Sequence, residues 1–243
     1  MDWVYLSPHF DDAAFSCGGL IWKQSHSGQQ VAVWTICAGD PPPGPPTPFA
    51  QYLHDRWGIS GNPVARRRRE DAAACRQLGA AWQHLAMPDC IYRRSPQDGS
   101  PLYTGEGELF GPVHPHETAL IDDLRAQLAQ NLPSEANIVC PLTIGGHADH
   151  RLVRAAAEGL GRRLWYYADY PYVQMKGASV EGKTKDMLLE CFHLSQVELG
   201  AWIGAAAQHA SQIASFWVDA EAMASAIRDY YRQMEGICLW RRI

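Results

Sequence analysis

The chain has 243 residues, of which 47% are hydrophobic and 19% are charged, and its formal net charge at pH 7 is −5. Its length fits one α/β domain, because a single hydrophobic core stops growing at roughly 250 residues. The negative charge argues against a nucleic-acid partner, and no stretch approaches the roughly 20 continuous apolar residues of a membrane span.

Seven cysteines are spread along the chain without a C-x-x-C pair. Several stand in apolar runs, where a reduced thiol behaves as a small hydrophobic side chain, so we expect buried free thiols. The first residues lack the basic region and the apolar run of a signal peptide, which predicts a cytoplasmic protein. A homo-oligomer is compatible with the sequence.

Short apolar runs alternate with longer helix-like segments along most of the chain. The runs cover residues 3–6, 31–37, 82–86, 137–142 and 164–168, and the helix-like segments cover residues 18–26, 64–78, 116–130 and 148–162. Strands that alternate with helices of this length form right-handed βαβ units. We therefore predict an α/β protein with a Rossmann-like three-layer fold, in which helices flank a mainly parallel sheet. Gly18 and Gly19 stand in no G-x-G-x-x-G pattern, so dinucleotide binding is not expected.

Two long loops interrupt this alternation. Residues 38–63 contain a proline tract, residues 41–46, which excludes a helix or an inner strand, and residues 89–115 are again rich in glycine and proline. We interpret both as active-site loops of a single domain over residues 1–243, whose last part, residues 183–243, is predicted to be helical. The loops carry aromatic side chains that are candidates for stacking on a sugar: Tyr52, Trp57, Tyr92, Tyr103 and Phe110.

One histidine and two aspartates follow the first apolar run. His9 and Asp12 stand three residues apart on the turn that leaves this strand, so an imidazole nitrogen and a carboxylate oxygen can converge on one cation. Asp11 points a second carboxylate into the same space, where it can act as a general base on a metal-bound water. A surface turn with two solvated aspartates is the alternative.

A second cluster, His147-Ala148-Asp149-His150, comes after the apolar run of residues 137–142. Ligands of open parallel sheets gather at the carboxyl ends of the strands, so both clusters are expected in one crevice. Asp149 either orients His147 through a ring N–H or caps the helix that follows.

The two clusters together supply the ligand set of a catalytic metal site. His9, Asp12 and His150 provide two imidazoles and one carboxylate, and three protein ligands leave a position open for water. His147 then remains to stabilise or protonate the reacting group. We expect Zn²⁺, and another divalent ion is compatible with the same ligands.

The motifs resemble those of the PIG-L or LmbE-like zinc-dependent de-N-acetylases. The family shares the pattern P-H-x-D-D followed by G-G, with a later H-x-D-H. Residues 67–80 are similar to its R-x-x-E-x-x-x-A-x-x-x-L-G helix, residues 166–172 to its Y-x-D-x-P-Y stretch, and residues 185–196 to its K…S-Q helix. The resemblance implies removal of an acetyl group from substrates that contain N-acetylglucosamine.

The resemblance also implies a role for each residue of the two clusters. It makes His9, Asp12 and His150 the zinc ligands, Asp11 the general base, His147 the electrostatic or acid catalyst and Asp149 the residue that orients it.

An arginine run begins the helix after the first loop. We predict that Arg67 or Arg68 binds a substrate hydroxyl or phosphate, and we place Tyr167 in the substrate site as well. A solvated helix face, with Glu70 and Asp71 as partners of the arginines, is the alternative.

The sequence thus predicts a metal-dependent hydrolase that removes an acetyl or other acyl group from the amide nitrogen of an N-acylated amino sugar or glycoconjugate. One alternative is an amidase that acts on a larger non-sugar or thiol-sugar conjugate. Another is a sugar-binding homologue without catalysis, although the presence of Asp11 argues against it. Many family members carry Glu where this chain has Ala13, which leaves the substrate open.

Overall fold

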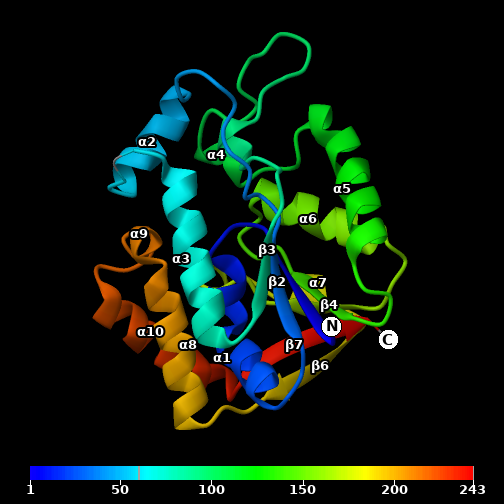
Figure 1. The fold of residues 1–243 in the computed structure, drawn as a ribbon, viewed down its shortest axis with the longest axis vertical. Coiled ribbons are helices and arrows are strands. Elements are labelled where there is room, and N and C mark those ends of the chain that lie inside the picture. The colour runs from blue at the N-terminus through cyan, green and yellow to red at the C-terminus, as the bar shows by residue number, and fades with distance from the viewer. Residues whose placement is uncertain (60, 243) are drawn as a thin grey trace.

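The computed structural model describes residues 1–59 and 61–242, which form a seven-stranded sheet between two layers of helices (Figure 1). The strands are β1 (Trp3–Ser7), β2 (Val31–Thr35), β3 (Ala81–His84), β4 (Asn137–Pro141), β5 (Leu164–Tyr167), β6 (Met187–Phe192) and β7 (Ile237–Arg242). Their order in the sheet is β3-β2-β1-β4-β5-β7-β6. The first five of these are parallel neighbours, and β7 pairs antiparallel with both β5 and β6. The predicted three-layer α/β fold with a mainly parallel sheet is confirmed.

Helices cover both faces of the sheet because its central strands are apolar on both sides. Successive side chains of a strand point to opposite faces, so β1 buries Tyr5 in one core and Val4 and Leu6 in the other. The first core is covered by α1 (Asp12–His26), α3 (Pro63–Leu78), α8 (Gln196–Gln208) and α10 (Ala220–Met234), and the second by α5 (Thr118–Asn131) and α6 (Ala148–Glu158).

In the described chain no helix is both long enough and apolar enough to cross a bilayer.

Local sequence signals fix the ends of α3. The side chain of Asn62 accepts a hydrogen bond from the backbone N–H of Ala65 at 3.0 Å, and Pro63 occupies the first turn, where a missing N–H costs nothing. Gly79 ends the helix in the left-handed conformation, with φ of 67°. These caps fix where the arginine run begins relative to the sheet.

The first long loop contains a helix, α2 (Pro48–Arg56), so the prediction that residues 38–63 exclude one is wrong. The proline tract ends at residue 46, and the helix begins only after it, at Pro48. Thr47 then caps it by accepting a hydrogen bond from the N–H of Ala50 at 3.1 Å, and Pro48 fits the first turn. The second long loop holds only short helices, η1 (Cys90–Tyr92) and α4 (Glu106–Leu109).

Residues 183–243 are also less helical than predicted, because β6 and β7 lie within them. The two strands pair from Met187 opposite Arg242 to Phe192 opposite Ile237. Each strand finds its partner only after the chain has passed through α8 and α10, and a local hydrophobic pattern cannot reveal such a pairing. The remaining short elements are η2 (Pro115–Glu117), η3 (Tyr172–Gln174), α7 (Glu181–Thr184) and α9 (Ala210–Ile213).

Two cysteines face each other in this antiparallel ladder. Cys191 and Cys238 are register partners and form a disulfide, so the expectation of free thiols is wrong for this pair. The other cysteines of the chain are buried free thiols, as expected.

Helix α1 packs against α8 through a glycine surface. Trp202 of α8 is fully buried, and its Nε1 donates a hydrogen bond to the carbonyl oxygen of Phe15 at 3.0 Å. A Cβ atom on Gly18 would lie 2.7 Å from Cδ1 of Trp202. Gly18 therefore allows α1 and α8 to approach each other closely.

We expect Gly18→Ala to lower the free energy of unfolding by about 1–3 kcal/mol, because the added methyl group overpacks the contact with Trp202. Gly200→Ala is the matched control, since Gly200 is also helical and its Cβ would meet no described atom within 4 Å. The control should gain about 0.5–1 kcal/mol from better helix propensity. Urea unfolding followed by circular dichroism measures both, and equal shifts would contradict the packing argument.

Candidate metal centre and active site

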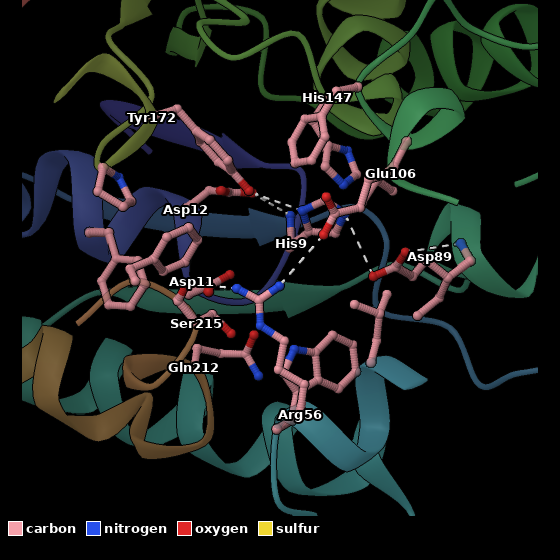
Figure 2. Close-up of a pocket in the computed structure, with 18 of the residues that line it drawn as sticks. His9, Asp11, Asp12, Arg56, Asp89, Glu106, His147, Tyr172, Gln212 and Ser215 are labelled. Carbon is pink, nitrogen blue, oxygen red and sulfur yellow. Dashed lines mark hydrogen bonds and ion pairs between the residues drawn. The ribbon is translucent and has the colours of Figure 1, made fainter. Parts of the chain in front are cut away.

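The two histidine–aspartate clusters meet at one edge of the sheet. Because β1 and β4 are parallel neighbours, the turns that follow them lie side by side. The first turn leads into α1, which begins at Asp12, and the second leads into α6, which begins at Ala148. Side chains from both turns line a cavity of about 340 Å³ (Figure 2).

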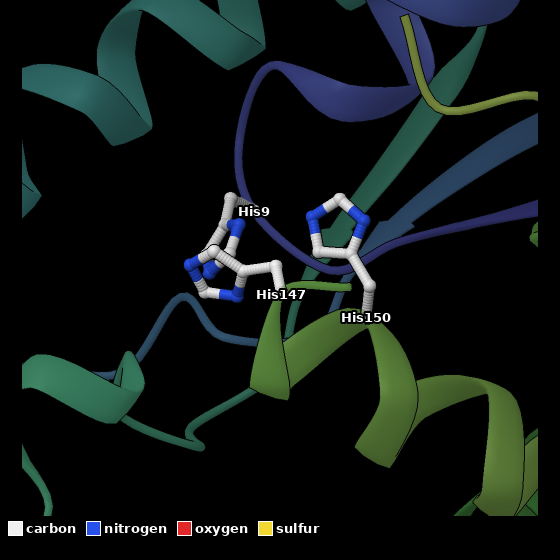
Figure 3. A group of neighbouring side chains, drawn as sticks. All are labelled: His9, His147 and His150. Atoms are coloured by element: carbon white, nitrogen blue, oxygen red, sulfur yellow. The ribbon is translucent and has the colours of Figure 1, made fainter. Parts of the chain in front are cut away.

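Three side chains bring ligand atoms together at this edge. Oδ2 of Asp12 lies 3.3 Å from Nδ1 of His9 and 3.3 Å from Nε2 of His150. Nε2 of His150 is buried and has no hydrogen-bond partner among the described residues. Ring nitrogens of His9, His147 and His150 also lie within 4.8 Å of one another (Figure 3). An oxygen and imidazole nitrogens that converge in this way fit a divalent cation such as Zn²⁺.

Carboxylates behind the two candidate ligands His9 and His150 fix the orientation of their rings. Nε2 of His9 donates to Oδ2 of Asp149 at 2.9 Å, and Nδ1 of His150 donates to Oδ1 of Asp169 at 2.6 Å. An ionised carboxylate only accepts hydrogen bonds, so these ring nitrogens carry the protons. The opposite nitrogens face Asp12 and are the atoms that could bind a cation in place of a proton. This arrangement is the usual one for metal-binding histidines.

Asp149 does not orient His147 through its carboxylate, which corrects that prediction. The carboxylate lies on His9, and the backbone N–H of Asp149 donates to Nδ1 of His147 at 3.2 Å, because His147 caps the start of α6. Burial lowers the pKa of the His147 imidazole, and the nearby His9 and His150 lower it further. The ring is therefore neutral, with its proton on Nε2, and His147 lines the cavity as a hydrogen-bond donor.

Asp11 lies in the same cavity beside a buried arginine. Nη2 of Arg67 donates to Oδ1 of Asp11 at 3.3 Å, and Nη1 of Arg67 lies 3.8 Å from Oδ2 of Asp89. Burial disfavours the charge of Arg67, but Asp11 and Asp89 outweigh it and raise the pKa of the guanidinium. The guanidinium also lies 4.9 Å from the centre of the Trp57 ring. Arg67 is therefore a fixed positive charge at the wall of the cavity.

The other two predicted substrate residues lie outside the cavity. Nη2 of Arg68 donates to the carbonyl oxygen of Ala38 at 2.7 Å and pairs with Asp40, so Arg68 anchors the first loop. Tyr167 is buried in the core, and its hydroxyl donates to the carbonyl oxygen of Leu6 at 3.2 Å. Arg68 is on a different side of α3 from Arg67, and the side chain of Tyr167 packs in the first core instead of lining the cavity.

Sequence reasoning missed several residues of the site. Asp169 stands two residues after the end of β5, the strand next to β4, and this position at a strand end is the signal that could have identified it. The last third of the chain supplies Tyr172, Gln212 and Ser215 to the cavity (Figure 2). Tyr172 and Asp169 stand in the Y-x-D-x-P-Y stretch, whereas no motif marks Gln212 and Ser215. Of the loop aromatics, Trp57 and Phe110 line the cavity.

Arg56 spans the mouth of this cavity. Its Nη2 donates to the carbonyl oxygen of Ser215 at 3.0 Å, and its Nη1 lies 3.8 Å from Oε1 of Glu106. The side chain thus connects the first loop with the second loop and with the segment between α9 and α10 (Figure 2).

The family model described as PIG-L, GlcNAc-PI de-N-acetylase, matches residues 4–160. The chain belongs to the PIG-L family. The predicted family is confirmed, and the matched segment of this PIG-L protein contains both histidine–aspartate clusters and both long loops.

Several relatives of this PIG-L protein are deacetylases. It is 32% identical over 188 residues to the 2'-N-acetylparomamine deacetylase of Niallia circulans, a match that covers 70% of this chain and 67% of the relative. It is 27% identical over 183 residues to the enzyme of the same name from Streptomyces fradiae, with 72% of this chain and 59% of the relative covered. The zinc-inhibited form of teicoplanin deacetylase Orf2 superposes with a TM-score of 0.84 at 26% identity, and the match covers 99% of this chain and 97% of that one.

We expect Asp169→Asn to weaken binding of Zn²⁺ by about 10–100-fold, because the variant removes the charged acceptor that orients His150. The dissociation constant is measured by competition with a chromophoric chelator. His26→Ala is the control, since His26 is an exposed histidine at the far end of α1. Unchanged affinity in Asp169→Asn would show that Asp169 does not support a metal ligand.

Proposed function

We propose that this protein is a zinc-dependent N-deacetylase that hydrolyses the acetamide of an N-acetylated amino sugar or a small glycoconjugate. The observation that carries the proposal is the position of Asp11. Its carboxylate lies in the cavity beside the ligand atoms of His9, Asp12 and His150, and it belongs to none of the contacts that hold those ligands. A base in this position is what hydrolysis of an amide requires.

Each residue of the site then has a distinct task. His9, Asp12 and His150 would hold the cation, which when bound supplies Lewis-acid polarisation of a carbonyl and a water of lowered pKa. Asp11 accepts the proton of the attacking water. His147, neutral and with a proton on Nε2, donates a hydrogen bond to the carbonyl oxygen as negative charge develops there.

The cavity fits a sugar better than a purely apolar acyl chain. Three charged side chains that line the cavity, those of Asp11, Arg67 and Asp89, offer partners for the hydroxyl and amino groups of a sugar. Trp57 and Phe110 offer aromatic faces. Sugar sites combine these two kinds of contact, because the ring has polar edges and apolar faces. The relatives named for 2'-N-acetylparomamine support an amino sugar as the substrate.

The direct test is release of acetate from N-acetylglucosamine and from 2'-N-acetylparomamine by the purified protein. A chelator should abolish turnover, and added Zn²⁺ should restore it. Substrates with longer acyl chains on the same sugars form the comparison arm, and a preference for them would favour a general amidase. Full turnover by metal-free protein would overturn zinc dependence.

We expect Asp11→Asn to lower kcat by about 10²–10⁴-fold, the usual contribution of a general base, because the amide cannot accept the proton of water. Affinity for Zn²⁺ should change little, since Asp11 is not among the proposed ligands. Kinetics and chelator competition on the same preparation separate these two effects. Parental kcat in Asp11→Asn would favour a different base.

Neighbouring arginines provide a second, paired test. Arg67→Met should lower kcat/KM by about 10²-fold, because Asp11 loses the side chain that fixes its position and small displacements of catalytic groups cost that much. Arg68→Met should keep the parental kcat/KM, because the polar partners of Arg68 among the described residues, Ala38 and Asp40, belong to the first loop. Steady-state kinetics on the same substrate compares them, and equal losses would contradict the assignment of the site to one face of α3.

A further inference from the structure

A chain of buried polar groups extends from the candidate metal centre into the second long loop. It begins at His9, whose Nε2 donates to Oδ2 of Asp149. The backbone N–H of Cys90 donates to the same oxygen at 3.0 Å. The other oxygen, Oδ1, lies 2.6 Å from Nη2 of Arg93, in an ion pair whose geometry is not that of a hydrogen bond, and no other described residue donates to Oδ1. Asp149 is fully buried, so its charge depends on these partners, of which Arg93 carries a permanent positive charge.

Arg93 is itself held on its far side by a second carboxylate. Its Nε donates to Oε1 of Glu117 at 2.5 Å, and its Nη2 donates to Oε2 at 3.3 Å, which gives the two-point contact that an arginine fork forms with a carboxylate. The hydroxyl of Tyr103 donates to Oε2 of Glu117 at 2.5 Å, and Nη1 of Arg93 donates to the carbonyl oxygen of Pro88. All of these side chains are buried.

We propose that Arg93 is a positioning residue for the metal centre: clamped by Glu117, it fixes the carboxylate of Asp149 and thereby the ring of His9. Both hydrogen bonds to Asp149 fall on Oδ2, so the contact of Oδ1 with Arg93 is what prevents the carboxylate from rotating about its own bond. A displaced carboxylate would release Nε2 of His9, and the ring would then turn its Nδ1 away from Asp12.

The same contacts connect the second long loop to the site. Arg93 and Tyr103 belong to this loop, and Glu117 belongs to η2 directly after it. The loop also carries Glu106 and Phe110, which line the cavity. The segment that forms one wall of the substrate cavity is therefore anchored on the carboxylate that orients a metal ligand. The inference rests on the proposed function only in taking this centre as the zinc site.

The test compares zinc binding and the spectrum of cobalt-substituted protein in Arg93→Met, Arg93→Lys and the parent. We expect Arg93→Met to raise the Kd for Zn²⁺ by about 10–100-fold, the usual effect of removing an outer partner of a metal ligand. Its visible Co²⁺ absorption bands should shift, because the geometry of His9 changes. Arg93→Lys should fall between the two, since lysine restores the charge but not the fork. KM for the acetylated sugar should change less than kcat.

Arg94→Met is the matched control. Arg94 is the next residue of the same loop, and its Nη1 donates to the carbonyl oxygen of Gly99 on the surface. This variant should keep the parental Kd, spectrum and kinetics. Thermal unfolding of the metal-free proteins reports folding. If Arg93→Met does not fold, Glu117→Gln takes its place, because it keeps the size of the side chain and loosens the clamp on Arg93. A smaller rise in Kd with a shifted Co²⁺ spectrum is then expected.

The outcomes separate this inference from the proposed function. Parental Kd and Co²⁺ spectrum in a folded Arg93→Met or Glu117→Gln would overturn the positioning role. Weakened zinc binding in these variants supports it, even if the parent releases no acetate, a result that would overturn only the proposed reaction. A parent that binds no Zn²⁺ overturns both.

Discussion

The parallel pairing of β1 with β4 is the constraint on which the rest of the site depends. Each strand ends in a tight turn that leads into a helix, and each turn carries one of the two histidine–aspartate clusters. If these strands were not neighbours, Asp12 could not lie 3.3 Å from His150, more than a hundred positions away in the chain. Parallel strands place their carboxyl ends at one edge, so the pairing creates the crevice.

Charge balance explains why the surroundings of this crevice are so polar. Five carboxylates lie there and are buried: those of Asp11, Asp12, Asp89, Asp149 and Asp169. Arginines balance part of this charge, with Arg67 beside Asp11 and Arg93 beside Asp149. Asp12 faces two imidazoles and accepts a hydrogen bond from the backbone N–H of His9, and a divalent cation at this point would add to the compensation. Unpaired buried charges are costly, so the pattern of partners itself favours a metal centre.

The two ends of the chain contribute differently to the cavity. The segment matched by the family model, residues 4–160, carries the predicted ligands, the base and the loop aromatics. Tyr172, Gln212 and Ser215 lie after it and form the opposite wall. Arg56 joins the two parts at the mouth through the carbonyl oxygen of Ser215. Most of the candidate centre therefore comes from the segment matched by the family model, whereas residues after this segment complete the wall of the cavity.

The sequence by itself determined the α/β class, the family, and the two clusters that meet at the site. These features are local: alternating strands and helices, and ligands three residues apart on a turn. The prediction that Asp149 orients His147 was wrong, because the packing of α6 against β1 decides whether this carboxylate faces His9 or His147. The sequence placed Tyr167 in the substrate site, although alternation along β5 turns that side chain into the core.

Only the tertiary structure decided the remaining contacts. Asp169, Arg93 and Glu117 reach the centre through pairings between distant segments, and β6 finds β7 only after the intervening helices have folded back on the sheet. No local pattern in the sequence predicts such contacts, because the partner of each residue is distant in the chain and comes close only in the folded protein.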